Sequence, residues 1–358
     1  MFRRDLLAGA AAGATAAALP RFAIAQPAAA RTLKYVPHAN LPNIDPFTNT
    51  AFIARDHAFL VFDQLYGMND KFEPVPQMAQ GHVVENDGLL WRFTLREGLK
   101  FHDGTPVRGR DCIASIKRWG RRDAFGQELM ARVADMTEDS DRVFTIKLNR
   151  PFAKMLEAFS KVTTSCLFIM PERLANVDPF TNLSEAVGSG PFRFVQNEWV
   201  PGSTVVYARN PDYVPVPNGT PSMTAGPKVA YFDRVEWRII PDASTAAAAL
   251  QSGEIDWWEQ PTADLFPLVA RNRNISVDVI NGTGLIGIFR PNHLTAPFNN
   301  PAVRRAVITA VNQIDFMTAV IGDATVPGYQ SLKREGIGYF APESPSASTV
   351  GLDRLKKS

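Results

Sequence analysis

The sequence predicts an α/β protein of more than one domain, and three observations predict it. Residues 232–240 alternate apolar and polar side chains from Val235 onward, as in a strand with one buried face. Strong helix formers follow at 245–251, and a second strand is expected at 254–259, which completes a βαβ-like unit. The chain has 358 residues, of which 45% are hydrophobic, enough for two domains with their own cores.

Residues 1–25 have the pattern of an export signal. Arg3 and Arg4 precede an apolar run at 6–19, and the small-residue pattern Ala-Ile-Ala at 23–25 marks a cleavage site near Ala25. The paired arginines resemble a twin-arginine signal, and an ordinary Sec signal is the alternative interpretation. We therefore expect a periplasmic chain with the signal removed, and no lipid anchor, because no cysteine lies at the cut.

Charge and cysteine content give no support for a nucleic-acid-binding protein or for a disulfide-rich protein. The formal charge of +2 comes from the predicted signal, so the remainder is balanced and a nucleic-acid partner is not implied. Cys112 and Cys166 are too few for a disulfide framework. We expect both to be small buried hydrophobic side chains, with a single bridge as the alternative.

Helices and strands follow in order along the rest of the chain. Period-two or helical spacing of apolar residues predicts a strand at 32–36, a helix at 54–65, strands at 91–96 and 144–148, and a helix from 111 to 119. A hairpin is expected from 192–195 and 205–207, a surface loop at 210–228, and further strands at 275–280 and 286–289.

Capping residues predict where two helices begin and end. Asp242 or Ser244 can cap the helix at 245–251, and Gly253 offers a left-handed C-cap. Asn300 followed by Pro301 predicts the start of another helix, with the cap and then proline at the first helical position.

An ordered set of short segments resembles the extracellular solute-binding proteins of family 5, the receptors of dipeptide, oligopeptide and nickel ABC importers. The segments are Asn-Ile-Asp-Pro (43–46), Trp-Arg-Phe-Thr-Leu-Arg (91–96), Phe-His-Asp-Gly-Thr-Pro-Val (101–107), Gly-Ser-Gly-Pro-Phe (188–192), Arg-Asn-Pro-Asp-Tyr (209–213), Gly-Glu-Ile-Asp (253–256) and Pro-Phe-Asn-Asn-Pro-Ala-Val-Arg-Arg-Ala (297–306). The resemblance covers nearly the whole chain after the signal. It implies a two-lobed type II periplasmic-binding-protein fold with a subdomain inserted in the first lobe.

The resemblance also implies domain boundaries. Residues 26–52 and 187–287 would form the first lobe, 53–186 the inserted subdomain, and 288–358 the start of the second lobe. Members of this family continue well past the point where this chain ends, so we expect the second lobe to be incomplete. The aspartate that captures a peptide's amino group lies in that later part, and no residue here is assigned its role.

Two adjacent tryptophans are candidate substrate-binding residues. Trp257 and Trp258 on one strand point to opposite faces, so at most one lines a cleft; packing roles for both are the alternative. Glu259 is expected to be a solvated carboxylate at the end of the strand, and contact with a ligand cation is the alternative.

Loop residues supply further substrate-binding candidates. Gly188, Ser189 and Gly190 are expected at the crossing back into the first lobe, where a backbone without side chains allows close approach; a plain turn is the alternative. Asn292 is a candidate to bond a ligand backbone, although a turn cap is favoured. The resemblance places Asn43, in the loop 38–43, facing the cleft.

Several motifs argue against an enzyme, a cofactor or a metal site. The G-x-G-x-x-G pattern at 282–287 is rejected as a dinucleotide fingerprint, because a strand and Pro291 follow it in place of a helix. The five histidines show no metal-ligand spacing, and no G-x-S-x-G elbow is present.

The sequence therefore predicts the periplasmic substrate-binding subunit of an ABC importer. We expect a monomer that captures peptides between two lobes, closes by a hinge motion and delivers them to permease subunits in the inner membrane. The alternatives are the same role for nickel chelate, opine, glycoside or haem, a non-functional fragment, and, less favoured, a secreted hydrolase.

Overall fold

The computed structural model describes residues 31–280, 287–322, 334–338, 340, 344, 346–350 and 352. The predicted export signal and residues 282–286 of the glycine-rich motif lie outside the described residues. Across the part of the chain that is described, no helix has the length and apolar character needed to cross a membrane.

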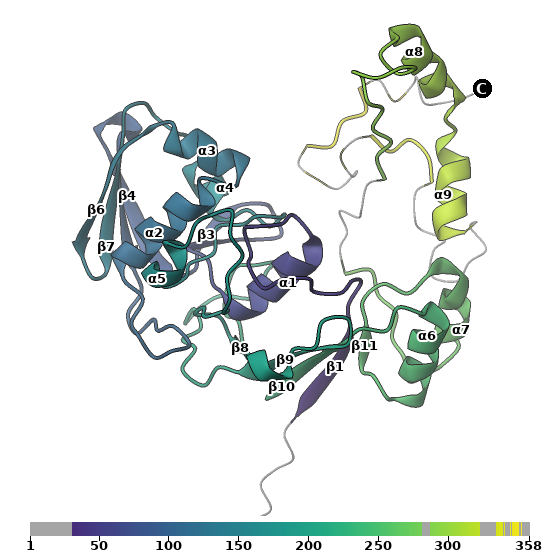
Figure 1. Ribbon diagram of the computed structural model, residues 1–358, viewed down its shortest axis with the longest axis horizontal. Coiled ribbons are helices and arrows are strands. Elements are labelled where there is room, and N and C mark those ends of the chain that lie inside the picture. Colours follow the sequence, from purple (N-terminus) through teal and green to yellow (C-terminus); the bar gives the residue numbers. More distant parts are fainter. Residues whose placement is uncertain are drawn as a thin grey trace, which may run out of the picture. The chain divides into compact units, whose positions relative to one another are not determined.

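Five β-strands form a mixed sheet (Figure 1). Its order is β11-β1-β10-β9-β8, with bounds Trp257–Trp258, Thr32–Val36, Arg234–Arg238, Thr204–Arg209 and Phe192–Phe194. Strand β1 pairs in parallel with both β10 and β11, whereas β9 is antiparallel to β10 and to β8. The predicted strand at 32–36 and the predicted hairpin are confirmed.

Helix α6 (Ala243–Ser252) connects β10 to β11, and the predicted βαβ-like unit is confirmed with β1 between its two strands. The Asp242 carboxylate accepts a hydrogen bond of 2.7 Å from the backbone N–H of Thr245. Gly253 ends the helix with φ of 75°, a left-handed conformation that favours glycine. The second strand is shorter than expected, because only Trp257 and Trp258 pair with β1.

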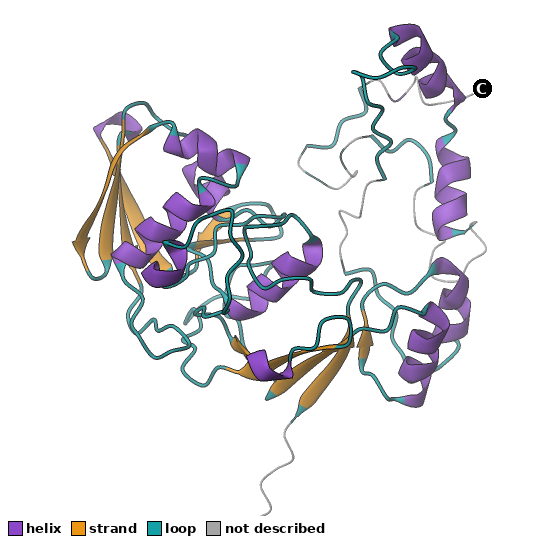
Figure 2. Ribbon diagram, viewed as in Figure 1, coloured by secondary structure: helices purple, strands orange, loops and turns teal. Residues whose placement is uncertain are grey.

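The second large sheet has four antiparallel strands, and helices lie beside it (Figure 2). Its order is β4-β5-β7-β6, with bounds Ala79–Glu85, Leu90–Leu95, Val143–Leu148 and Val133–Ser140. Helix α2 (Gly109–Trp119) packs against β6 and β7. The predicted strands at 91–96 and 144–148 and the helix at 111–119 are confirmed within one or two residues.

The remaining elements before residue 280 are short apart from α1 (Phe52–Val61). Their bounds are β2 Tyr66–Met68, β3 Pro74–Pro76, α3 Ala124–Met130, α4 Met155–Phe159, α5 Glu172–Ala175 and α7 Phe266–Ala270, with 3-10 turns η1 Asn86–Gly88, η2 Gln196–Glu198 and η3 Ala263–Leu265. The predicted helix at 54–65 is α1, which begins two residues earlier and ends at Val61.

One hydrophobic core is continuous between the two large sheets. It includes Phe93 and Phe144 from the antiparallel sheet and Tyr207 and Trp237 from the mixed sheet. Cys112 and Cys166 are buried free thiols, so the interpretation as small hydrophobic side chains is confirmed. Burial raises the pKa of both thiols, which keeps them protonated and unreactive at neutral pH.

The core also holds a charged pair. The guanidinium of Arg118 donates a 2.7 Å hydrogen bond to Asp45, and both side chains are fully buried. Asp45 accepts further hydrogen bonds from the backbone N–H groups of Phe47 and Leu183, and Arg118 donates to the carbonyls of residues 177, 178 and 181. The pair is therefore well supplied with partners, and it fixes the segment before α1 against the loop after α5.

Helices α8 (Pro301–Ala310) and α9 (Gln313–Ile321) follow later in the chain. The side-chain Oδ1 of Asn300 accepts a 2.9 Å hydrogen bond from the N–H of Ala302, and Pro301 is the first helical residue, as predicted. The strands predicted at 275–280 and 286–289 are wrong where the structure describes them, because 275–280 and 287–289 form no strand. Val279 and Ile280 are 64% and 76% exposed, so these apolar side chains do not form the buried face that a half-buried strand would have.

Candidate functional site

The carboxyl ends of three parallel strands define one edge of the mixed sheet. Strands β1, β10 and β11 run in the same direction, so the residues that follow Val36, Arg238 and Trp258 emerge at this edge. The loop after β1 is tied to the hairpin before β9, because the side chain of Asn40 accepts a 2.8 Å hydrogen bond from the N–H of Gly202. Ligands of open α/β sheets bind in general outside such carboxyl ends.

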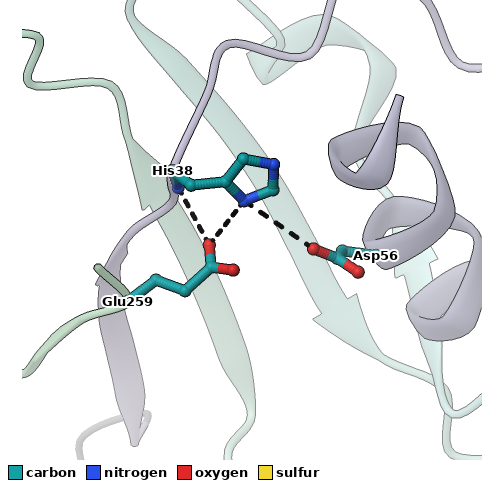
Figure 3. Close-up of side chains that lie close together, drawn as sticks. All are labelled: His38, Asp56 and Glu259. Carbon is teal, nitrogen blue, oxygen red and sulfur yellow. Dashed lines mark hydrogen bonds and ion pairs between the residues drawn. The ribbon is translucent and has the colours of Figure 1, made fainter. Parts of the chain in front are cut away.

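Three titratable side chains meet at this edge, and we call His38, Asp56 and Glu259 the carboxylate–histidine cluster (Figure 3). Oε2 of Glu259 accepts a 2.9 Å hydrogen bond from the backbone N–H of His38 and lies 2.9 Å from its Nδ1. Oδ2 of Asp56 lies 4.0 Å from the same Nδ1. One ligand atom from each residue falls within 4.8 Å of the other two.

The fold brings these residues together from distant parts of the sequence. His38 follows the end of β1 by two residues, and Glu259 follows β11 directly, with its N–H bonded to the Val36 carbonyl at 3.0 Å. Asp56 comes from the middle of α1. Their side chains are 18%, 22% and 23% exposed for His38, Glu259 and Asp56 respectively, so the cluster is partly open to solvent.

Mutual hydrogen bonding and burial shift the pKa values in the cluster. Burial favours the neutral form of Glu259, but hydrogen bonds from His38 and Tyr35 outweigh it and hold the Glu259 pKa below its usual value. The hydrogen bond to Glu259 raises the pKa of His38, against the opposing effect of burial. Burial raises the pKa of Asp56, partly offset by Arg55. Both shifts favour the charged forms of His38 and Glu259, so they favour a charge-assisted hydrogen bond between the two side chains.

The two tryptophans occupy opposite faces of the sheet, as their spacing predicts. Trp257 is 43% exposed, and its ring packs edge-on against Tyr35 with centroids 5.3 Å apart. Trp258 is half-buried and packs on the small core formed with Val36 and Ala246. Of the pair, Trp257 is the one available to a ligand, and its contact with a ligand stays a prediction.

The expectation that Glu259 is a solvated strand-end carboxylate is wrong. Its side chain is only 22% exposed, and it accepts hydrogen bonds from His38, in the loop after β1, and from Tyr35, in β1. The position of Glu259 directly after a strand of a βαβ-like unit was the feature of the sequence that indicated a place at the edge of the sheet. No local pattern in the sequence links His38 with Asp56. The spacing between histidines cannot reveal a cluster that is made of one histidine and two carboxylates.

Gly188, Ser189 and Gly190 lie against the last turn of α1. Gly190 donates a 2.8 Å hydrogen bond to the Val61 carbonyl, and a Cβ at Gly188 would stand 2.1 Å from that oxygen. The close approach expected here is therefore made by helix α1, and Ser189 is buried. A role of these three residues in ligand binding stays a prediction.

Asn43 and Asn292 both cap local turns. The side-chain Oδ1 of Asn43 accepts hydrogen bonds from the Asp45 N–H at 3.2 Å and from the Asn49 side-chain amide at 3.1 Å. Asn292 accepts from the Leu294 N–H at 3.0 Å, which is the turn cap favoured for it. Ligand contacts by either side chain remain predictions.

An open depression of about 390 Å³ lies between α1 and the loop before β10. It is lined by Phe59, Pro191, Phe192, Met223, Thr224, Lys228, Val229 and Ala230. None of the cluster residues is among them, and this lining offers one charged side chain in a mostly apolar surface. We place the candidate site at the strand edge, where aromatic and charged side chains converge.

The chain is similar to bacterial solute-binding proteins along most of its length. The family model described as "Bacterial extracellular solute-binding proteins, family 5 Middle" matches residues 73–356. The probable peptide ABC transporter periplasmic-binding protein y4tO of Sinorhizobium fredii is 39% identical over 326 residues, which cover 90% of this chain and 60% of that protein. The glutathione-binding protein GsiB of Salmonella typhi is 25% identical over 278 residues, covering 77% of this chain and 51% of that protein.

A solved structure shares the fold. The oligopeptide-binding protein AppA from Bacillus subtilis, in complex with a nonapeptide, matches with a TM-score of 0.67 and 22% identity, covering 88% of this chain and 58% of that chain. At this identity the likeness concerns the fold alone. The present chain spans about half to three fifths of the length of these relatives.

Proposed function

Because the chain belongs to the bacterial extracellular solute-binding proteins of family 5, we propose that it is the substrate-binding subunit of an ABC importer and that it captures peptides. The family consists of solute-binding transport proteins, and the relatives y4tO and AppA carry peptide and oligopeptide binding in their names. In this proposal binding and release are the whole chemistry, with no bond broken. The partners would be permease subunits in the inner membrane.

The observation that carries the proposal is the exposed indole of Trp257 at the carboxyl ends of the parallel strands. A flat apolar surface that packs on Tyr35 accepts side chains of many shapes, which a peptide receptor needs. The adjacent cluster places ionisable groups within the same edge. Trp257, His38 and Glu259 belong to β11 or to the segments that follow β1 and β11, at the edge where open α/β sheets bind ligands.

Export to the periplasm belongs to the same proposal. The family is extracellular, and residues 1–25 carry the basic, apolar and small-residue regions of a signal. We infer that this segment is cut near Ala25 and that the twin arginines direct the chain to the twin-arginine route. Fractionation of cells expressing the chain, with N-terminal sequencing of the periplasmic product, checks the location and the cut site.

Calorimetry tests the peptide ligand. The purified chain is titrated with mixed di- to pentapeptides, and saturable binding is expected. The Trp257→Ala variant should bind roughly tenfold or more weakly, as large aromatic contacts in binding sites commonly account for over 1 kcal/mol. Tyr231→Ala is the matched control, because Tyr231 is an exposed aromatic side chain that precedes β10 and so lies at the opposite edge of the sheet.

Three outcomes would count against the proposal. Absence of peptide binding by a folded wild-type chain would favour a fragment that does not function alone. Equal loss of affinity in Trp257→Ala and Tyr231→Ala would remove Trp257 from the site. Steady hydrolysis of peptides or esters by the chain would argue for an enzyme.

A further inference from the structure

We propose that the carboxylate–histidine cluster of His38, Asp56 and Glu259 is a site for one divalent first-row transition-metal ion, of the Zn²⁺ class, bound directly by the three side chains. This goes beyond the proposed capture of peptides, and it does not depend on the peptide ligand. The argument rests on donor geometry, on donor chemistry and on the way surrounding residues orient the ligands.

The donor atoms already stand close to the positions that a metal requires. Zn²⁺ lies about 2.0–2.2 Å from histidine nitrogen and carboxylate oxygen, so two ligand atoms of a tetrahedral site are roughly 3.3–3.5 Å apart. Nδ1 of His38 is 2.9 Å from Oε2 of Glu259 and 4.0 Å from Oδ2 of Asp56. Rotations that move these atoms by under about 1 Å would bring all three onto one ion.

The chemistry of the donor set selects the class of metal. One imidazole nitrogen with two carboxylate oxygens suits Zn²⁺, Ni²⁺, Co²⁺ or Cu²⁺, whereas Mg²⁺ and Ca²⁺ prefer oxygen ligands throughout. Three protein ligands leave a coordination position for water or for a donor atom of another molecule. The ion would take the place of the proton that His38 Nδ1 now shares with Glu259.

Neighbouring groups hold the ligands in orientation. Nε and Nη2 of Arg55 both donate to Oδ1 of Asp56, at 2.9 and 2.7 Å. The other oxygen, Oδ2, is turned toward His38 (Figure 3). Arg55 is itself held by the Val162 carbonyl at 3.3 Å. The backbone N–H of His38 fixes Oε2 of Glu259. Such outer contacts set the geometry of metal ligands and strengthen binding.

The charges that face the cluster favour a cation. The titratable and charged groups that face the cluster come from four segments. They are His38 from the loop after β1, Asp56 and Arg55 from α1, Tyr35 from β1, and Glu259 from the end of β11. When the ion displaces the proton from the His38 imidazole, the groups that remain carry two negative charges, on Asp56 and Glu259, and one positive charge, on Arg55. Metal binding requires a deprotonated imidazole nitrogen, so protons compete with the metal for this ligand.

Titration with metal alone tests the site. The full chain is stripped with EDTA, exchanged into chelator-free buffer without peptide, and titrated with ZnCl₂ by calorimetry; one equivalent should bind saturably. His38→Asn, Asp56→Asn and Glu259→Gln should each weaken binding by tenfold or more. His293→Asn and Glu254→Gln are matched controls on exposed side chains outside the cluster, and they should bind as the wild type does.

Spectroscopy of the wild type keeps the test independent of variant folding. X-ray absorption of the Zn²⁺ complex should show nitrogen and oxygen ligands at about 2.0–2.2 Å with no sulfur, since both thiols are buried elsewhere. Lack of saturable binding by the folded chain overturns the proposal. So does binding that the three cluster variants leave unchanged, or that the two controls weaken equally. Peptide affinity enters none of these measurements, so failure of the peptide proposal is seen separately.

Discussion

His38 and Glu259 stabilise the native chain in a pH-dependent way that follows from their pKa shifts. The pKa of His38 is raised by its hydrogen bond to Glu259, so its contribution is fully present below about pH 6.5 and is lost as pH rises through the higher native value. The pKa of Glu259 is lowered, so its contribution is lost as pH falls through a value below its usual one. Between these limits both groups are charged.

The pH dependence is measurable as a difference between variants. In buffer with EDTA, His38→Asn should lower the free energy of unfolding by on the order of 1 kcal/mol at pH 6, because the charge-assisted bond is partly exposed. The deficit should shrink as the pH rises past the native pKa of His38. Urea unfolding at intervals from pH 5 to 9 gives the comparison. A deficit that grows with pH would contradict the assignment.

At this scale the sequence predicted some side chains well and others poorly. Capping by Asp242 and Asn300, and the burial of Cys112 and Cys166, could be predicted because they depend on a few neighbouring residues or on intrinsic preference. The environment of Glu259 could not, because its partner His38 lies 221 positions away. Only the pairing of β11 with β1 brings the two together.

The contact between α1 and the Gly188–Gly190 turn shows how elements constrain one another. The N–H of Gly190 bonds to the Val61 carbonyl at the end of α1, and its own carbonyl accepts bonds from His102 Nε2 and from the Asn210 amide, each 3.0 Å long. Two elements from distant sequence therefore meet through backbone atoms, which leaves no space for a side chain.

Adding one methyl group at this contact should be costly. Gly188→Ala places a Cβ 2.1 Å from the Val61 carbonyl oxygen, and the backbone must shift to relieve it. We expect a loss of about 2–4 kcal/mol in the free energy of unfolding. Gly81→Ala, where no atom lies within 4 Å of the added Cβ, is the control, with a change below about 1 kcal/mol.

The two glycine variants are compared by urea unfolding at one pH. A similar small change in both would show that the turn relaxes easily and that the contact with α1 does not constrain it.

Element boundaries were predicted where the local pattern was strong and the fold supplied a partner. Strand β1, helix α6 and the hairpin of β8 and β9 fall where their patterns placed them. Residues 275–280 have a strand pattern, but among the described residues no strand pairs with them, and the alternation has no sheet to join. Strand β11 is limited to two residues for a related reason, since its pairing with β1 stops at Val36.

The whole molecule has the α/β type II periplasmic-binding-protein fold of family 5, as its ordered motifs predicted. The proposed boundaries at 52/53 and 186/187 remain a prediction. The first falls at the start of α1, and His57 of that helix contacts Tyr207 of the mixed sheet at 2.9 Å. Motif order indicated the fold, but it did not show that one core joins both sheets.

That shared core predicts cooperative unfolding of the region 31–280. Phe93 and Phe144 of the antiparallel sheet belong to the same buried cluster as Tyr207 and Trp237 of the mixed sheet. Hydrogen exchange with mass spectrometry in increasing urea should therefore show β7 and β9 losing protection at one common midpoint. Separate midpoints would show that residues 53–186 unfold as an independent unit, in agreement with the proposed insertion.

The placement of Trp257 also gives the protein a natural optical reporter. The chain has six tryptophans, and Trp91, Trp119 and Trp237 are buried, whereas the Trp257 indole is 43% exposed beside the carboxylate–histidine cluster. Solvent-exposed indoles emit at longer wavelength and are open to quenching by acrylamide. Any molecule that covers this edge should shift the emission toward the blue and shield it from the quencher, so occupancy can be followed in unlabelled protein.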